Sequence, residues 1–139
     1  MPELAVSHLS CRRNGQQILQ SSNFSLSGGE LVILLGPNGV GKSTLSVNLA
    51  ARLAAQGASV GLLDADIYGP SLPRLIGSSR KPDYENKKLI PLDAWGLQAM
   101  SIGFLIESES PMIWRGPMVM SAIEQMIRDV LWSDLDVLV

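Results

Sequence analysis

One stretch of the chain has residue types and a spacing that could hold a phosphate, Gly36-Pro37-Asn38-Gly39-Val40-Gly41-Lys42-Ser43. It fits the pattern G-x-x-x-x-G-K-[ST] at every fixed position. Glycines let successive backbone N–H groups turn toward phosphate oxygens, which a Cβ atom would obstruct. Lys42 would reach the β- and γ-phosphates, and the Ser43 hydroxyl would ligate Mg²⁺. The stretch therefore predicts binding of a nucleoside triphosphate together with magnesium.

The elements on both sides of this stretch suit that chemistry. The apolar run Leu31 to Leu35 predicts a buried parallel strand before it. After it, Leu45, Leu49 and Leu53 recur every four residues and predict a helix that ends at Gly57. The positive N-terminus of that helix would point at the same anion. The alternative is a glycine-rich turn that matches by accident, and the strand and helix on either side favour nucleotide binding.

Nine consecutive residues of the stretch are predicted to bind the nucleotide. They are Gly36, Pro37, Asn38, Gly39, Val40, Gly41, Lys42, Ser43 and Thr44.

Composition narrows the function classes. The chain has 139 residues, 46% hydrophobic and 17% charged, which predicts a globular protein with a real core. Its net charge of −2 gives no electrostatic case for nucleic acid, and no apolar run approaches the roughly 20 residues of a membrane span. The single cysteine, Cys11, excludes an internal disulfide and suits a reducing compartment. We therefore expect a cytoplasmic protein without nucleic-acid binding or membrane insertion.

The residues before the apolar run predict a β-hairpin. Two loosely alternating stretches, Leu4 to Ser10 and Gln17 to Leu26, flank the turn signal at residues 12–15. His8, the only histidine, is expected to be solvated or hydrogen-bonded within a strand rather than to act as a ligand.

A second candidate site follows the helix. Ser59 to Leu63 predicts a short strand that delivers Asp64-Ala65-Asp66 at its carboxyl end, where ligands bind in open α/β sheets. Strand, helix and strand in this order predict a right-handed βαβ unit and a parallel sheet.

The polar residues 70–88 predict a mobile loop that serves as a lid or partner surface. Within them, Asn86-Lys87-Lys88-Leu89 lacks the aspartate that would complete a guanine-reading N-K-x-D, so ATP is predicted rather than GTP.

The rest of the chain predicts two further strands, 89–92 and 97–102, about a turn at 93–96. A helix is predicted from Pro117, and a last strand covers residues 135–139. The helix is expected to bury one face, made of Met118, Ala122, Met126 and Val130.

Residues 3–45, with Leu26-Ser27-Gly28-Gly29-Glu30 leading into the phosphate stretch, resemble the start of an ABC-transporter ATPase subunit of the haem-exporter type. That resemblance implies an antiparallel β-subdomain over residues 1–30. It also implies an aromatic side chain that stacks on adenine, and Arg13 lies near that position. Because a guanidinium can stack on a base, Arg13 is included among the predicted nucleotide-binding residues.

From Gly39 onward the chain resembles the Mrp/ApbC iron–sulfur cluster carriers, relatives of MinD and ParA. The matching residues are Gly-Leu-Leu-Asp-Ala-Asp-Ile-Tyr-Gly-Pro-Ser at 61–71, Met-Ser-Ile-Gly-Phe-Leu at 100–105 and Ile-Trp-Arg-Gly-Pro-Met-Val-Met-Ser-Ala at 113–122. The resemblance implies that Asp66 positions the attacking water and that Asp64 supports the magnesium shell. Lys42 and Asp66 are then the catalytic residues, and Ser43 and Asp64 the metal-binding ones. The alternative is that both aspartates only cap their turn.

Two departures from the carrier pattern carry expectations. The carriers have a lysine after the first glycine of the loop, which reaches a partner's nucleotide, and Pro37 stands there in this chain, so a homo-oligomer is expected to be weakened. In the carriers the strand at 135–139 continues into the Walker B aspartate, a second switch and a C-x-x-C, which the 139 residues do not include. Weak hydrolysis and no bound iron–sulfur cluster are therefore expected.

These observations predict an α/β P-loop NTPase fold, Rossmann-like and three-layered, with a mainly parallel sheet and an N-terminal antiparallel β-subdomain. A single domain is expected over 1–139, with residues 31–139 as the nucleotide-binding core. The predicted function is Mg·ATP binding by a relative of the cluster carriers, with ATP and ADP as ligands. Two alternatives stay open: an engineered chimera whose phosphate loop is only architecture, and a fragment of an ABC-transporter ATPase.

Overall fold

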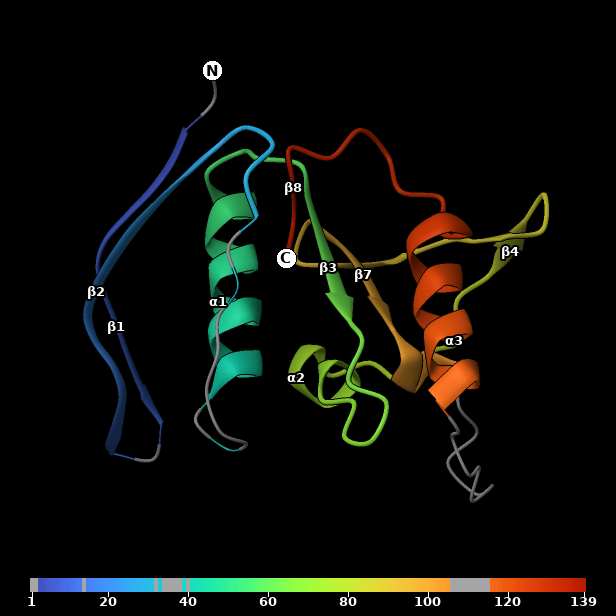
Figure 1. Ribbon diagram of the computed structural model, residues 1–139, viewed down its shortest axis with the longest axis horizontal. Helices are drawn as coiled ribbons and strands as arrows, with labels where there is room; N and C mark the ends of the chain where they lie inside the picture. The colour runs from blue at the N-terminus through green and yellow to red at the C-terminus, as the bar shows by residue number, and fades with distance from the viewer. Residues whose placement is uncertain (1–2, 14, 32, 34–38, 40, 106–115) are drawn as a thin grey trace. The chain divides into compact units, whose positions relative to one another are not determined.

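A computed structural model of the chain describes residues 3–13, 15–31, 33, 39, 41–105 and 116–139 (Figure 1). The chain divides into two compact units, Met1–Leu45 and Ser46–Val139. The expected single domain over the whole chain stays a prediction.

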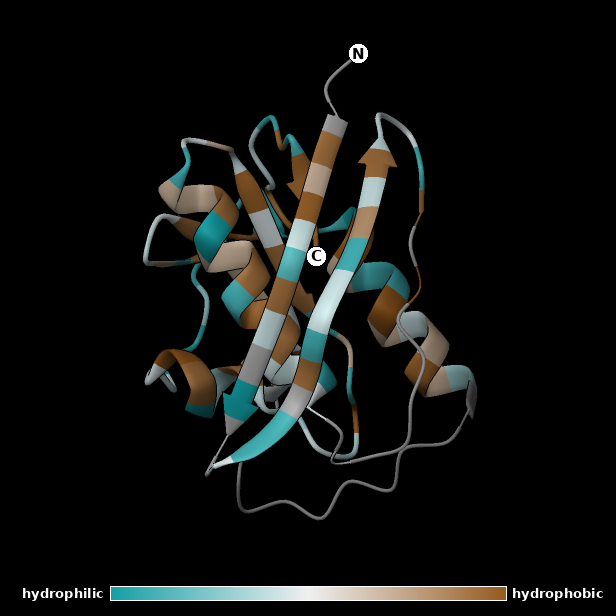
Figure 2. Cartoon of the chain, turned by 90° about the vertical axis from the view of Figure 1, so that its left-hand side faces the viewer, coloured by the Kyte–Doolittle hydropathy of each residue, from teal (hydrophilic) through white to brown (hydrophobic). Residues whose placement is uncertain are grey.

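The first unit contains a two-stranded antiparallel ribbon of β1 (Glu3–Arg13) and β2 (Gln16–Ser27). Leu4 pairs with Leu26 and Val6 with Phe24. Hydrophobic residues gather toward the start of β1 (Figure 2), where Leu4 and Val6 are half-buried and Ala5 is exposed, the alternation of a strand with one covered face. The predicted hairpin is confirmed, but its turn is shorter than predicted, because β1 continues through Arg12 and Arg13.

The ribbon is irregular around His8, where the pairing register shifts. His8 and Ser21 both have left-handed backbones, with φ of 53° and 46°. The Asn23 Oδ1 accepts a hydrogen bond from the His8 N–H at 2.8 Å, and the His8 Nδ1 lies 3.0 Å from the Ser21 Oγ. His8 is therefore an exposed, hydrogen-bonded strand residue, as predicted.

The second unit contains a four-stranded sheet in the order β6-β7-β3-β8. The strand β3 (Val60–Asp64) runs parallel to both of its neighbours, β7 (Leu97–Ser101) and β8 (Val137–Leu138). The edge strand β6 (Leu92–Ala94) pairs antiparallel with β7. The predicted mainly parallel sheet is confirmed.

Two longer helices flank this sheet on opposite sides (Figure 1), α1 (Lys42–Ala55) and α3 (Gly116–Arg128). They give the unit the three layers expected of an α/β fold. Among the described residues no helix is long and apolar enough to cross a membrane. The buried apolar core of the unit includes Val47, Ala50, Leu53, Val60, Leu62, Leu97, Ala99, Met100, Phe104, Met126 and Val130.

Residues 70–88 are more ordered than the predicted loop. They include the short helix α2 (Leu72–Ile76) and the strand β4 (Tyr84–Glu85), which forms a hairpin with β5 (Lys88–Leu89). Leu89 is buried, and its N–H and C=O bond the backbones of Asp129 and Leu131 at 2.7 and 2.8 Å. The prediction of a loop was wrong because it rested on the polar composition of the segment. Two residues of the hairpin region, Pro82 and Leu89, are buried.

Strand boundaries in the following segment also differ from the prediction. The expected strand 89–92 is divided between β5 and β6, with Ile90 and Pro91 between them. The turn is only two residues long, Trp95 and Gly96, both with left-handed backbones (φ of 56° and 77°).

Of the predicted buried face, Met126 in α3 is buried and Ala122 is half-buried, whereas Met118 is 46% exposed. Val130 is buried but lies beyond α3, which ends at Arg128. Met118 lies eight residues before Met126, which is about 80° around a helix at about 100° per residue. It therefore sits on the flank of the buried arc.

The predicted buried strand over residues 31–35 is wrong for the two residues that the structure describes. Leu31 and Ile33 belong to no strand and are 82% and 68% exposed. An apolar run becomes a buried strand only where a neighbouring strand takes up its backbone hydrogen bonds, and neither residue has such a pairing. Residues 32, 34 and 35 lie outside the described part of the chain.

Gly61, in the middle of β3, allows close packing of the side chains of Trp132, Leu135 and Leu138. A Cβ atom there would lie 2.6 Å from Leu135 Cδ1, 2.8 Å from Leu138 Cδ1 and 3.3 Å from the Trp132 ring. These distances are shorter than van der Waals contact, so any side chain would have to displace its neighbours.

We predict that Gly61→Ala lowers the free energy of unfolding by about 1–3 kcal/mol, the usual cost of overpacking a close-packed core. Denaturant unfolding followed by circular dichroism measures this change. Gly69→Ala is the matched control, because a Cβ at Gly69 would meet no atom closer than 3.6 Å. Equal stability of Gly61→Ala and the control would show that the sheet relaxes freely at this point.

Candidate functional site

The phosphate stretch leads into α1, whose first residue is Lys42. Gly39 and Gly41 have left-handed backbones, with φ of 81° and 95°, a conformation that disfavours residues with a side chain. The helix forms its hydrogen bonds at once, because the Leu45 N–H donates to the Gly41 carbonyl at 2.9 Å. The glycines at these two positions are thus needed by the backbone itself.

The remaining predicted loop residues differ in what the structure describes. Ser43 is exposed in the first turn of α1, and Lys42 and Thr44 beside it are half-buried. Gly36, Pro37, Asn38 and Val40 lie outside the described residues. Arg13 is the last residue of β1 and pairs with Gln16, and its side chain lies outside the described part of the chain.

The second candidate site begins at the carboxyl end of β3. Parallel pairing places Asp64 opposite Ser101, the last residue of β7. The Asp64 carboxylate accepts three hydrogen bonds: its Oδ1 from the Asp66 N–H at 3.1 Å, and its Oδ2 from the Leu72 N–H at 2.9 Å and the Ser101 hydroxyl at 3.1 Å. Ser101 is fully buried, and its Oγ also accepts the Gly103 N–H at 3.0 Å.

Asp66 has a different environment. It is exposed, and its Oδ1 accepts one hydrogen bond, from the Gly69 N–H at 3.1 Å. Both aspartates therefore bond backbone N–H groups of their own turn, as the structural alternative predicted. Asp66 in addition presents a carboxylate to solvent, where a cation or a water molecule could reach it.

The later residues of this turn, Pro70 and Pro73, pack closely against Gly103. A Cβ at Gly103 would lie 2.9 Å from Pro70 Cβ and 3.0 Å from Pro73 Cγ. Gly103 belongs to the short 3₁₀ helix η1 (Ile102–Phe104), directly after β7. One end of the turn thus contacts the last residue of β7, and the other end contacts the segment that follows β7.

Sequence patterns alone do not mark Ser101 or Gly103 as site residues. A signal was available, because strands 59–63 and 97–102 were both predicted and parallel strands end at the same edge of a sheet. The alignment of the two strands, which places Ser101 opposite Asp64, needs the structure.

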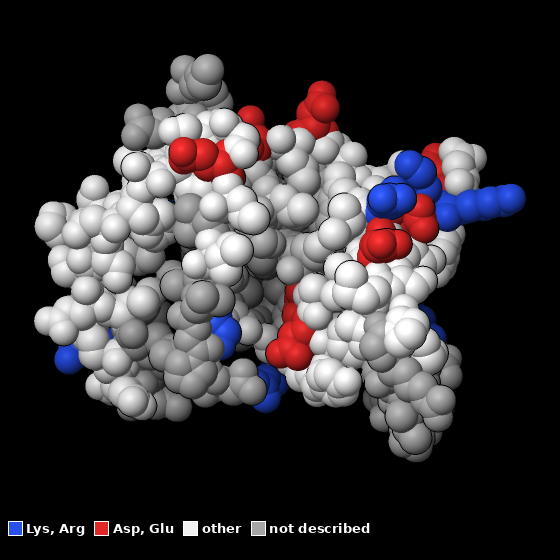
Figure 3. All heavy atoms as spheres, viewed as in Figure 1, with Lys and Arg blue, Asp and Glu red and all other residues white. Residues whose placement is uncertain are grey.

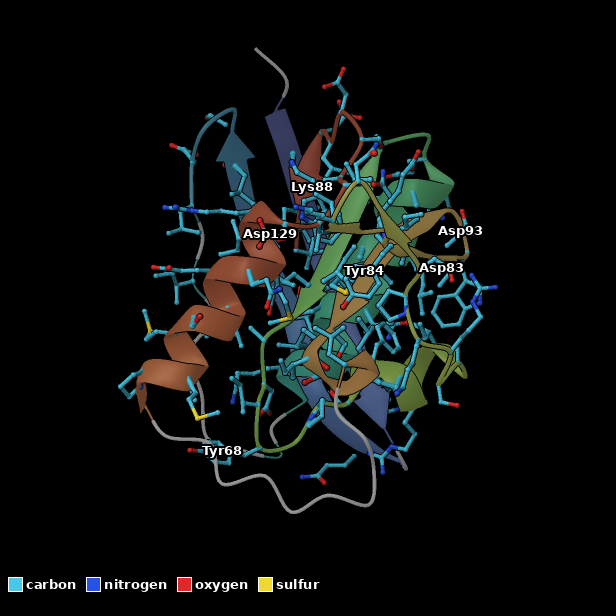
Figure 4. All side chains as sticks on the ribbon, turned by 90° about the vertical axis from the view of Figure 1, so that its right-hand side faces the viewer. Tyr68, Asp83, Tyr84, Lys88, Asp93 and Asp129 are labelled. Carbon is cyan, nitrogen blue, oxygen red and sulfur yellow. The ribbon has the colours of Figure 1, made fainter. Side chains whose placement is uncertain are left out.

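Charged side chains of both signs are mixed on part of the surface. On the face shown in Figure 3, basic and acidic side chains are interspersed over the β4–β5 hairpin and form no continuous basic surface. In the part of the chain that the structure describes, no group of three or more His, Cys, Asp or Glu could hold a metal ion by itself. Tyr68, 83% exposed, lies in the turn after β3, at the end of the unit away from Lys88 and Asp129 (Figure 4).

Known proteins match most of the chain. The family model described as ParA, the NUBPL iron-transfer P-loop NTPase, matches residues 29–139. The iron–sulfur cluster carrier protein of Helicobacter pylori is 54% identical over 112 residues, which are 78% of this chain and 30% of that protein. The iron–sulfur cluster transfer protein NUBPL of Mus musculus is 50% identical over 112 residues, 78% of this chain and 35% of that protein.

A solved structure matches as well. A nucleotide-binding protein from Archaeoglobus fulgidus, in complex with ADP, superposes with a TM-score of 0.61 at 36% identity, covering 73% of this chain and 38% of that one. The chain therefore spans about a third of the length of the curated relatives and of this neighbour.

The resemblance of residues 3–45 to ABC-transporter ATPases gains no support from these comparisons, and neither does a chimeric origin. Residues 1–28 lie outside the matched family region. The β-ribbon predicted from that resemblance is present, but an antiparallel hairpin is too common to identify a family.

The motif at 36–43, the parallel sheet with Asp64 and Asp66 at the end of β3, and the family match over residues 29–139 agree with one another. The chain belongs to the ParA family, in the group of NUBPL iron-transfer P-loop NTPases.

Proposed function

We propose that this chain binds Mg·ATP through residues 36–44. The observation that carries the proposal is the start of α1 at Lys42, directly after a motif whose described glycines, Gly39 and Gly41, have the left-handed backbone of a phosphate-binding loop. The Archaeoglobus neighbour, described as a complex with ADP, supports a nucleotide as the ligand.

The residues present suit a magnesium nucleotide. Mg²⁺ is usually held by one or two protein side chains together with phosphate oxygens, so a preformed group of three ligands is not required. Ser43 would supply a hydroxyl, and the N–H groups at the start of the 14-residue helix α1 favour a bound anion. When bound, the metal neutralises charge on the phosphates.

For hydrolysis we propose two residues. Lys42 would neutralise charge at the transferred phosphoryl group, and Asp66 would position the attacking water. Removing one such positioned group commonly lowers the rate by about 10²–10³. Slow turnover and the stacking of adenine on Arg13 also stay predictions. A cytoplasmic location is likewise a prediction, and one relative, from Arabidopsis thaliana, is named as a mitochondrial protein.

We predict that Lys42→Ala weakens ATP binding by about 1.5–3 kcal/mol, the worth of a hydrogen bond to a charged group, or roughly 10- to 150-fold. Isothermal titration calorimetry with ATP and Mg²⁺ measures it. Lys87→Ala is the matched control, since it removes the same charge from an exposed position in the β4–β5 hairpin. Equal affinity of Lys42→Ala and wild type would mean that the loop survives only as architecture.

Ser43→Ala tests whether Ser43 contributes to ATP affinity through the metal or through the phosphates. We expect it to lower ATP affinity in the presence of Mg²⁺ and to leave affinity in EDTA within about twofold, because the hydroxyl acts on the metal. An equal loss in both conditions would contradict the assignment of Ser43 to magnesium.

Iron–sulfur cluster binding is a separate question, since the relatives are named for it. We predict that the 139-residue chain alone holds no cluster, because ligation normally takes four thiolates and Cys11 is the only cysteine. Anaerobic reconstitution followed by iron analysis and absorption spectroscopy tests this. Stoichiometric iron with a charge-transfer band would show that Cys11 bridges chains around a shared cluster.

We also propose that any homo-oligomer built on a shared nucleotide is weakened by Pro37, which offers neither a charge nor an N–H. Sedimentation velocity with and without Mg·ATP is expected to show no nucleotide-dependent dimer. Dimerisation that requires the nucleotide would refute this proposal.

A further inference from the structure

The two aspartates after β3 have unequal surroundings. We call residues 64–73, which run from the end of β3 into α2, the switch turn. Asp64 is half-buried within it and accepts three hydrogen bonds, whereas Asp66 is exposed and accepts one. The two aspartates are only two residues apart in the sequence, but they differ in exposure and in the hydrogen bonds that they accept.

Asp64 takes the place of a missing helix cap. The residue before α2 is Ser71, a type that usually caps a helix with its own side chain, but it makes no such bond here. The first N–H of the helix, at Leu72, donates instead to the Asp64 Oδ2, eight residues earlier in the chain. The same carboxylate thus joins the end of β3 to the start of α2.

The donors leave little of this carboxylate for a metal. A carboxylate has about four lone-pair sites, two on each oxygen. Two donors occupy Oδ2 and one occupies Oδ1. A cation at Asp64 would have to compete with the Leu72 and Ser101 donors or use the last site, whereas Asp66 has acceptor sites open to solvent.

We propose that Asp64 is the positioning residue of the switch turn rather than a magnesium ligand, and that it acts by holding the turn from which Asp66 presents its carboxylate to solvent. The part of the proposal that concerns magnesium rests on the proposed Mg·ATP binding. The anchor role of Asp64 does not, because it follows from hydrogen bonds within one unit of the free protein.

The packing of Gly103 supports the same role for the turn as a whole. Pro70 and Pro73 lie so close to Gly103 that no side chain fits between them. The turn is therefore held against residues 101–103 twice, by hydrogen bonds to Ser101 through Asp64 and by proline contacts to Gly103.

Asp64→Asn tests the anchor in the nucleotide-free protein. The amide keeps the shape but replaces one acceptor oxygen with an NH₂ that would face N–H or O–H donors. We expect the Leu72 and Asp66 amides to exchange with solvent at least about tenfold faster, as measured by NMR hydrogen exchange.

Two control variants define the comparison. Asp66→Asn should leave the Leu72 amide at its wild-type exchange rate, since the Asp66 carboxylate bonds only the Gly69 N–H among the contacts described. Ser133→Ala removes the hydrogen bond that Gln98, on the same strand as Ser101, donates through its Nε2 to the Ser133 Oγ, without touching the switch turn. Wild-type exchange at Leu72 in Asp64→Asn would overturn the proposal.

Calorimetry with ATP, with and without Mg²⁺, tests the second half. For a positioning residue, Asp64→Asn should change both affinities alike, so that their ratio stays within about twofold of wild type. A ratio that falls toward one would identify Asp64 as a metal ligand and overturn the proposal, whatever the exchange data show. Failure of the wild type to bind ATP would refute the proposed function, and the exchange experiment would still decide the anchor.

Gly103→Ala keeps the proposal testable if Asp64→Asn does not fold. It pushes on Pro70 and Pro73 and leaves the carboxylate intact. We expect faster exchange at the same Leu72 amide. Unchanged exchange there would show that the turn is not held by residues 101–103, and the proposal would fall.

Discussion

The parallel pairing of β3 with strands on both of its sides is the constraint on which the second unit depends. With β7 on one side and β8 on the other, the backbone hydrogen bonds of β3 are taken up within the sheet. Val60 and Leu62 are then buried almost completely, at 1% and 3% exposure. The strand ends at Asp64, opposite the last residue of β7, so the pairing in the sheet positions Asp64.

The Asp64 carboxylate accepts hydrogen bonds from residues at increasing distances along the sequence. Asp64 reaches Asp66 two residues on, Leu72 eight residues on and Ser101 thirty-seven residues on. Buried polar groups are costly unless they are paired, and the buried Ser101 hydroxyl is paired both as donor and as acceptor. The Asp64 carboxylate thus accepts hydrogen bonds from the end of β7, from its own turn and from the start of α2.

Much of this fold could be predicted from the sequence, because its signals are local. The spacing of Leu45, Leu49 and Leu53 predicted α1, and alternation predicted the β1–β2 hairpin. The apolar run at 59–63 predicted β3 and put the aspartates at its carboxyl end. The phosphate motif predicted the residues at the start of α1, and its nucleotide role stays a proposal.

What could not be predicted depends on contacts between distant residues. The exposure of Leu31 and Ile33 shows that an apolar run does not by itself supply a pairing strand. The helical spacing placed Met118 and Met126 on the same side of α3, but Met118 is exposed and Met126 is buried. How far burial extends around a helix depends on the residues packed against it, which the spacing does not reveal. A related limit applies to Gly61, whose missing side chain makes room for Leu135 and Leu138. These three positions share one volume, so changes among them should be non-additive, and a larger residue at 61 should accompany smaller ones at 135 or 138 when related sequences diverge.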